Sequence, residues 1–258
     1  VSSFFTKLLG SALLVRSNVK CSSHQFAIGV KDGASRIVHL TRQAFEEGKA
    51  VVRMDLSNAF NVAQRGRIRE ILHDHDTDVL RYFMTMYEPA SDLAVFGPKG
   101  DVAFVVSEEG VRQGDAFSAF FFCLLMDRIC LAVQDKHPSA QLMSFMDDLT
   151  ITVQHSEVNE VVASALQLIE DSGFRVNVGK SAVICAAERF DAQDLQLPTV
   201  SPDEEFEMLG ANITHNFDSF NKAQVAKIDS FFRILGKCDL HPQLEWTLLR
   251  LCGFPKLV

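Results

Sequence analysis

A long, almost wholly apolar segment at residues 117–133 is the feature that most limits how this chain can fold. Only Asp127 and Arg128 within it are charged. Because a helix that is apolar on all sides has to be buried, the other elements must cover it. The two charges also interrupt it, so it is no candidate for a membrane span, which needs about 18 uninterrupted apolar residues. The segment therefore predicts the central helix of a globular core, with no membrane partner.

Helical and strand-like segments alternate around this helix. A period near 3.6 residues predicts helices, and short apolar or alternating runs bounded by turn residues predict strands. The expected helices are 34–47, 64–72, 78–87, 117–133, 157–171, 221–235 and 242–251. The expected strands are 50–54, hairpins over 92–107 and 142–153, and short runs at 174–178, 182–185 and 207–213. This order indicates an α+β fold, with an antiparallel sheet backed by helices on one face.

Charge and cysteine content narrow the functional classes. The net charge is −8, which is the wrong sign for a generic nucleic-acid binder. The first 54 residues carry eight basic and three acidic side chains, so a basic lobe precedes an acidic body. This distribution fits a phosphate-binding lobe beside a metal-binding body, but charge alone favours solvated helix faces. The six cysteines form no Cys-x-x-Cys pair, which argues against a structural zinc site and for an intracellular, reducing compartment.

Three aspartates at predicted strand ends form the main candidate site. Asp55 closes the apolar strand 50–54, and Asp147 and Asp148 occupy the tip of the hairpin over 142–153. Neighbouring strands would bring these carboxylates together, where they repel one another unless a divalent cation lies between them. Hard oxygen ligands select Mg²⁺ or Mn²⁺, and two such ions can promote phosphoryl transfer. The alternative is that Asp-Asp simply forms a hairpin turn, for which Asp is a favoured residue.

The aspartates belong to a set of segments in a fixed order. The set is Asp55-Leu-Ser-Asn-Ala-Phe60, Gly110-Val-Arg-Gln-Gly-Asp115, Phe145-Met-Asp-Asp148, Gly173-Phe-Arg-Val-Asn-Val-Gly-Lys180 and Phe206-Glu-Met-Leu-Gly210. In this order and at these separations it resembles the palm motifs of reverse transcriptases. Gln25-Phe-Ala-Ile-Gly-Val30 and the closing segment 248–256 resemble the non-LTR retrotransposon branch of that family.

The resemblance implies an RNA-directed DNA polymerase, a nucleotidyltransferase that uses two Mg²⁺ ions, or Mn²⁺ in their place. It implies a right-hand polymerase palm at 50–215 that includes a hairpin over 91–110, preceded by a partial fingers segment at 1–49 and followed by the start of a thumb at 216–258. The implied partners are an RNA template, a DNA or RNA primer and deoxynucleoside triphosphates. A retrotransposon protein of this kind would work in the nucleus or cytoplasm, and an organelle stays open.

The resemblance also assigns roles around the metal site. Asp55, Asp147 and Asp148 would be the catalytic metal ligands, joined by the backbone carbonyl of Leu56. Phe60 would be the gate under the sugar that excludes a 2′-hydroxyl, and the alternative is a ring that only fills the core.

Further residues are implied to contact the substrates. Gln113 and Gly114 would line the nucleotide and template pocket, with glycine allowing a close approach of the backbone. Lys180 would lie near the triphosphate as a charge partner or proton donor, or it is an exposed lysine in a turn. Met208, Leu209 and Gly210 would form the ridge under the primer terminus, or merely a β-turn.

Some features depart from the family pattern. Ala116 stands where the family usually has proline, and Phe145 stands where it usually has tyrosine. The basic finger strands that grip the triphosphate are not recognisable. A second function therefore stays open, in which a catalytically retired relative serves as an RNA-binding or structural subunit beside other subunits of a ribonucleoprotein.

Overall fold

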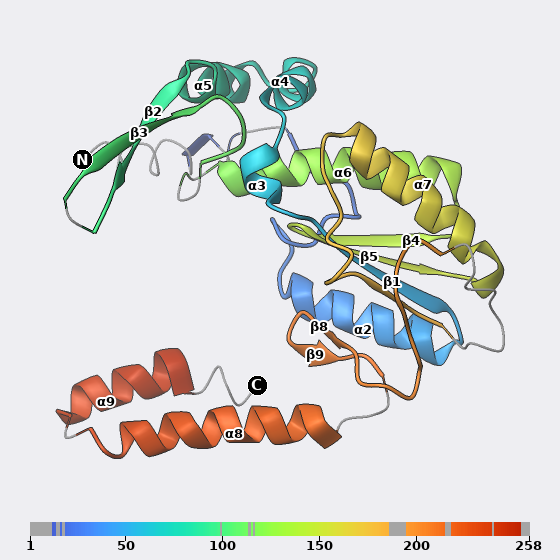
Figure 1. Cartoon of the computed structure of the whole chain (residues 1–258), viewed down its shortest axis with the longest axis vertical. Helices are drawn as coiled ribbons and strands as arrows, with labels where there is room; N and C mark the ends of the chain where they lie inside the picture. The colour runs from blue at the N-terminus through green and yellow to red at the C-terminus, as the bar shows by residue number, and fades with distance from the viewer. Residues whose placement is uncertain are drawn as a thin grey trace. The chain divides into compact units, whose positions relative to one another are not determined.

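The computed structural model of the chain describes residues 12–13, 16, 19–98, 100–112, 115, 117–185, 195–214, 218–238 and 240–253. The chain divides into two compact units, Val1–Ser201 and Pro202–Val258 (Figure 1). Within the described ranges, no helix is both long enough and apolar enough to cross a membrane.

A five-stranded sheet forms the centre of the first unit, in the order β4-β5-β1-β6-β7. The strands are β1 (Ala50–Asp55), β4 (Gln141–Phe145), β5 (Asp148–Val153), β6 (Ala182–Ile184) and β7 (Thr199–Val200). β1 lies in the middle and pairs antiparallel with β5 on one side and β6 on the other. β7 was not anticipated from the sequence and pairs with β6 in the parallel direction.

Helices cover both faces of this sheet (Figure 1). The helices α6 (Ser118–Lys136) and α7 (Val158–Asp171) lie on one face, and α2 (Gly33–Glu46) lies on the other. The middle of α6 is buried, as its apolar sequence predicted. Helices were expected on one face only. The second face is covered because α2 buries its own apolar side, including Ile37 and Val38, and the sheet is apolar there too, for example at Val51.

The segment between β1 and α6 in the chain contains three further helices and a separate hairpin. It comprises the helices α3 (Ala59–Val62), α4 (Arg65–His73) and α5 (Thr77–Tyr87) and a hairpin of β2 (Ser91–Phe96) and β3 (Val102–Ser107). A 3₁₀ turn at His155–Glu157 precedes α7. The predicted helices at 64–72 and 78–87 and the first hairpin are thereby confirmed. The strand expected at 174–178 is reduced to one bridge between Leu56 and Val176.

The second unit contains a small hairpin and a helical pair. The strands β8 (Glu207–Met208) and β9 (Ala211–Asn212) are joined by Leu209 and Gly210, whose φ angles are 49° and 78°. Two positive φ angles are what a two-residue hairpin loop requires. The helices α8 (Asp218–Leu235) and α9 (Pro242–Leu248) follow, and a π-helical turn covers Leu249–Gly253. Together the two units have the predicted α+β composition.

Candidate active site at the ends of β1 and β5

The register between β1 and β5 brings two of the predicted carboxylates together. Asp55 is the last residue of β1 and lies directly opposite Asp148, the first residue of β5. Opposite residues of an antiparallel pair project to the same face of the sheet. Both side chains are only partly exposed. The paired strand ends therefore hold two carboxylates side by side at one end of a rigid sheet.

The third carboxylate lies in the adjoining turn. The β4–β5 pairing closes at Phe145 opposite Asp148, so Met146 and Asp147 form the two-residue tip. Met146 has a left-handed backbone with φ of 55°, and its carbonyl oxygen accepts a hydrogen bond from the Ser144 hydroxyl at 3.3 Å. The hairpin predicted over 142–153 is confirmed, and its tip carries Asp147.

Two cationic side chains reach this carboxylate cluster. Nη2 of Arg53 lies 3.5 Å from Oδ1 of Asp148, and Nζ of Lys180 lies 3.9 Å from Oδ2 of Asp55. Burial raises the pKa of Asp148 above its usual value, the Arg53 guanidinium opposes this rise, and the charges of Asp147 and Asp55 add to it. Burial is therefore the main reason that the ionised form of Asp148 is disfavoured, and the two neighbouring carboxylates add to it.

The donor chemistry of the site fits a hard divalent cation. Asp55, Asp147 and Asp148 supply only carboxylate oxygens, which Mg²⁺ prefers. A cation beside Asp148 would favour its ionised form, which burial disfavours. As the side chains stand, no three His, Cys, Asp or Glu residues of the described part of the chain lie close enough together to hold an ion. Binding an ion would therefore require the three carboxylates to move closer together.

A neighbouring segment at 175–181 fixes the backbone around Asp55. The Asp55 amide donates to the Ser181 hydroxyl at 3.0 Å, and its carbonyl accepts from the Asn177 amide at 2.8 Å. The Ser57 amide donates to the Arg175 carbonyl at 2.8 Å. The β-bridge between the buried Leu56 and Val176 therefore does not use the Leu56 carbonyl. The same segment carries Lys180 to Asp55.

Phe60 lies on the short helix α3, soon after Asp55 in the chain. Its ring stacks on that of Phe122 in α6, with centroids 4.6 Å apart and an interplanar angle of 18°. Phe122 is fully buried, whereas Phe60 is partly exposed. One side of the Phe60 ring is thus supported by the core while part of it stays accessible, which is compatible with either role foreseen for it.

The segment at 110–115 packs against α3 but is described only in part. Gln113 and Gly114, expected in the nucleotide pocket, lie outside the described residues, as does Ala116. The Gly110 amide donates to the Ala63 carbonyl at 3.0 Å. Gly110 has φ of 73°, and a Cβ there would lie 2.4 Å from the Asn61 carbonyl oxygen. Only glycine allows this approach of the segment to α3.

Sequence reasoning missed a polar network that supports the same segment. Asp115 accepts hydrogen bonds from the Tyr82 hydroxyl at 2.8 Å and the Tyr87 hydroxyl at 2.5 Å. Burial and the hydrogen bond to Asp115 raise the pKa of both tyrosines, so they remain donors at neutral pH. Arg65 donates to the carbonyls of Tyr87, Ser107, Glu109 and Gly110. No short sequence motif joins these residues, because the partners lie 22 to 45 positions apart.

Met208, Leu209 and Gly210 lie in the second unit. Met208 is buried there, and Leu209 and Gly210 form the loop of the β8–β9 hairpin. Asn212 organises this hairpin, because its Oδ1 accepts from the Phe206 and Thr214 amides at 3.1 and 3.2 Å. The three residues therefore form a β-turn, and contact with a primer stays a prediction.

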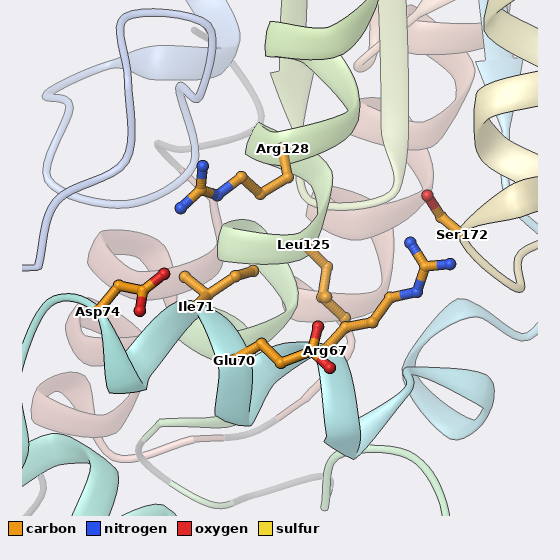
Figure 2. A pocket seen from close by; sticks show the side chains of 7 residues that line it. All are labelled: Arg67, Glu70, Ile71, Asp74, Leu125, Arg128 and Ser172. Carbon is orange, nitrogen blue, oxygen red and sulfur yellow. The ribbon is translucent and has the colours of Figure 1, made fainter.

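A pocket of about 310 Å³ opens elsewhere on the first unit (Figure 2). Figure 2 shows that its lining comes from α4, α6 and nearby loops: Arg67, Glu70, Ile71, Asp74, Leu125, Arg128 and Ser172. Arg67 is bonded to Gln64 and to the Asp171 carbonyl, and Arg128 lies 3.2 Å from His75. Its cations are thus engaged by the protein itself, and the pocket contains none of the predicted site residues.

Comparison with known proteins identifies the family. A family model described as reverse transcriptase (RNA-dependent DNA polymerase) matches residues 10–213. Because this match covers most of the chain, the protein belongs to the reverse transcriptase family. The resemblance based on the ordered motifs is confirmed.

Two curated relatives are proteins of retrotransposable elements. The 132 kDa protein of the SLACS element of Trypanosoma brucei gambiense is 21% identical over 267 residues, covering 96% of this chain and 21% of the relative. The Pol polyprotein of the R2 element of Popillia japonica is 22% identical over 230 residues, covering 80% of this chain and 37% of the relative. The chain thus spans only a fifth to somewhat over a third of their length. The expected non-LTR branch is confirmed.

Solved structures with the same fold include telomerases. The telomerase of Candida albicans in complex with a TWJ fragment of telomeric RNA matches with a TM-score of 0.56 at 12% identity, covering 91% of this chain and 43% of that one. The apo telomerase of Candida tropicalis matches with a TM-score of 0.53 at 10% identity, covering 81% and 38%. At this identity the likeness concerns the fold, and it confirms the α+β polymerase palm.

Proposed function

We propose that this chain is the polymerase part of a non-LTR retrotransposon reverse transcriptase, which copies an RNA template into DNA. The observation that carries the proposal is the register of Asp55 against Asp148, with Asp147 in the adjoining turn. Three carboxylates at one end of the central sheet, in a chain that belongs to the reverse transcriptase family, support this proposal.

The carboxylates would act as the metal ligands. Asp55, Asp147 and Asp148 would hold two Mg²⁺ ions, with the carbonyl of Leu56 as a backbone ligand and Mn²⁺ as a substitute metal. When bound, the ions would favour ionisation of the primer 3′-hydroxyl and stabilise charge on the leaving pyrophosphate as the hydroxyl attacks the α-phosphate. The protein's own contribution is to hold the ligands on paired strand ends, which limits how far Asp55 and Asp148 can separate.

The residues around the carboxylates would position the nucleotide. Lys180, whose ammonium already lies 3.9 Å from Asp55, would neutralise the triphosphate or protonate the leaving group. The partly exposed ring of Phe60 would lie under the sugar and leave no room for a 2′-hydroxyl. Gln113 and Gly114 would line the base and template side of the pocket.

The proposed domain boundaries follow the same assignment. Residues 1–49 would be part of the fingers, 50–215 the palm including the hairpin over 91–110, and 216–258 the start of the thumb. The turn at Met208, Leu209 and Gly210 would support the primer terminus.

The proposed partners are an RNA template, a DNA or RNA primer and deoxynucleoside triphosphates. All six cysteines are free thiols, which supports a reducing compartment such as the nucleus or cytoplasm.

A second candidate is a retired reverse transcriptase that serves as an RNA-binding or structural subunit of a ribonucleoprotein, and the net charge of −8 favours the structural role. An acidic chain gains little from the phosphate backbone of a nucleic acid, so tight binding to primer and template would need other sources of affinity. The carboxylates favour the enzyme, because a retired subunit has no need for three acidic side chains at the end of a sheet.

A primer-extension assay on an RNA template separates the two candidates. It would be run with Mg²⁺ on this chain and on the longest natural polypeptide that contains it. Asp147→Asn keeps the shape of the side chain but removes a charge that holds the cation, so extension should fall by at least ~10³-fold. Asp135→Asn, on the exposed end of α6, is the matched control and should leave extension unchanged.

Two results would favour the retired subunit. One is no extension by the wild-type protein with either Mg²⁺ or Mn²⁺. The other is an Asp147→Asn protein that leaves the function of its ribonucleoprotein intact in cells. Loss of extension in Asp147→Asn alone, with normal folding by circular dichroism, would support the polymerase.

A further inference from the structure

We propose that Gln25 is a positioning residue that holds in place the hairpin tip bearing Asp147, which adjoins Asp148 at the start of β5. The inference rests on the proposed function, because it concerns how the proposed metal ligands are oriented. Gln25 lies far from the tip in the chain, and nothing in the ordered motifs connects the two.

The backbone around Gln25 runs along the edge of β4. Gln25 forms a parallel bridge with Ser144, the residue two positions before Met146. The Phe26 amide donates to the Ser144 carbonyl at 2.9 Å, and the Ser144 amide donates to the His24 carbonyl at 2.7 Å. The segment thus extends the sheet by one short pairing beside the hairpin tip.

The side chains continue this contact into the tip itself. Nε2 of Gln25 donates to Oγ of Ser144 at 3.3 Å, and Oγ of Ser144 donates to the Met146 carbonyl at 3.3 Å. Oε1 of Gln25 accepts from the Ala27 amide at 2.5 Å, which fixes the orientation of the amide group. A serine hydroxyl that accepts from Gln25 must turn its own hydrogen elsewhere, and here it points to Met146. The result is a directed chain of hydrogen bonds from Gln25 to the tip.

Both relay residues are buried. Gln25 is 2% exposed and Ser144 is fully buried. An apolar side chain of similar size would fill the same space at position 25. The role of the Gln25 amide is therefore in the hydrogen bonds that it makes. Met146 adopts the left-handed backbone conformation, which non-glycine residues rarely adopt without support. The bond to its carbonyl gives that support next to Asp147.

The segment that carries Gln25 is itself held at both ends. On one side, Asp127 of α6 accepts from the Ser22 amide at 2.8 Å and from its hydroxyl at 2.5 Å. On the other, Gly33 at the start of α2 leaves room for the Phe26 carbonyl, which a Cβ would approach to 1.9 Å. The backbone on both sides of Gln25 is therefore held in place, as a positioning residue requires.

Two substitutions break the relay at different points. Gln25→Met keeps the length of the side chain and removes its hydrogen bonds, and Ser144→Ala removes the hydroxyl while leaving the backbone bridge. The matched control is Thr41→Val in α2, whose fully buried hydroxyl has no hydrogen-bond partner among the described residues. If one relay connects the two residues, the double variant Gln25→Met/Ser144→Ala should lose no more Mn²⁺ affinity than either single variant.

The decisive readouts are binding of Mn²⁺ to the protein without substrates, followed by electron paramagnetic resonance, and hydrogen–deuterium exchange at residues 145–148. We expect each relay variant to raise the Mn²⁺ dissociation constant by about 10-fold, as loss of a group supporting a metal ligand typically does. Exchange at the tip should accelerate while α7 exchanges as in the wild type. In extension assays kcat should fall, with KM for the primer–template unchanged.

The proposal is overturned if both relay variants match Thr41→Val in Mn²⁺ affinity and in exchange at the tip. It is also overturned if exchange rises equally in the tip and in α7, because that indicates general destabilisation. Should Gln25→Met fail to fold, Ser144→Ala decides alone by the same criteria. Absence of extension by the wild-type protein would instead count against the proposed function, while selective loosening of the tip in the relay variants would still support the positioning role.

Discussion

Lys180 and Asp55 form an ion pair across the end of the central sheet, with Nζ of the lysine 3.9 Å from Oδ2 of the aspartate. The lysine is well exposed and the aspartate mostly buried, at 67% and 14% of their side-chain surfaces. The pair therefore has a cation free to swing toward an arriving phosphate and a carboxylate that stays in place. This asymmetry suits a substrate-binding lysine better than a structural salt bridge.

Replacement of Lys180 should affect turnover much more than stability. Because the lysine is exposed, Lys180→Met should change the free energy of unfolding by less than about 1 kcal/mol. If Lys180 protonates the leaving group, kcat should fall by about 10²-fold, and Lys180→Arg should not restore it. If it serves only as a charge, Lys180→Arg should recover most of the activity. Steady-state primer extension measures kcat and KM of the two Lys180 variants, with the exposed Lys136→Met as the control. Unchanged kcat and KM in Lys180→Met would exclude Lys180 both as a proton donor and as a charge partner.

The metal-free protein should become less stable as the pH rises through the titration of Asp148. Its pKa in the folded protein is raised above the ordinary value of 3.8, so folding favours the protonated form. The stabilisation is complete below that ordinary value and is lost as the pH rises through the raised one. Asp148→Asn should remove this dependence and be at least as stable as the wild type near pH 7.

Urea unfolding at a series of pH values between about pH 4 and pH 8 measures this effect. Added Mg²⁺ should restore stability to the wild type at neutral pH and have little effect on Asp148→Asn, because a cation bound only to the folded state stabilises it. Asp135→Asn is the control for removal of an exposed carboxylate. Equal pH profiles for the wild type and Asp148→Asn would show that folding does not raise the pKa of Asp148.

Truncation of Phe60 tests whether its ring faces the substrate. Phe60→Ala should raise ribonucleotide incorporation relative to deoxynucleotide incorporation by at least ~10-fold, since a pocket enlarged by a few carbon atoms loses discrimination of this order. Loss of the stack on Phe122 should also destabilise the fold, by about 0.5–1.5 kcal/mol. Phe122→Leu weakens the same stack from the core side and should leave the incorporation ratio unchanged. A ratio unaffected by Phe60→Ala would assign the ring to the core alone.

Local patterns in the sequence predicted much of this site. The apolar run before Asp55 and the alternation after Asp148 locate both strands, and their antiparallel pairing follows from the order of elements. The sequence could not show that Arg53 reaches Asp148 or that Gln25 reaches Ser144, because such contacts depend on strand register and on which segment covers a sheet edge. For the same reason β7, whose two residues have no periodicity, was missed.

Arg65 should be the most sensitive position for the support of the 107–112 segment. Its guanidinium donates to four backbone carbonyls and to the Ser107 hydroxyl, all at 2.9 or 3.0 Å. Lysine keeps the charge but cannot reproduce the planar fork, so Arg65→Lys leaves several carbonyls without their donor. We expect a loss of about 2–4 kcal/mol in the free energy of unfolding.

The natural control is Arg69→Lys on the same helix, because Arg69 makes one exposed pair with Glu88. Its replacement should change the free energy of unfolding by less than about 0.5 kcal/mol. Hydrogen–deuterium exchange should accelerate at 107–112 in Arg65→Lys and not in Arg69→Lys. Equal stability of the two variants would mean that the segment is held by Gly110 and the tyrosines on Asp115, and that the arginine network is dispensable.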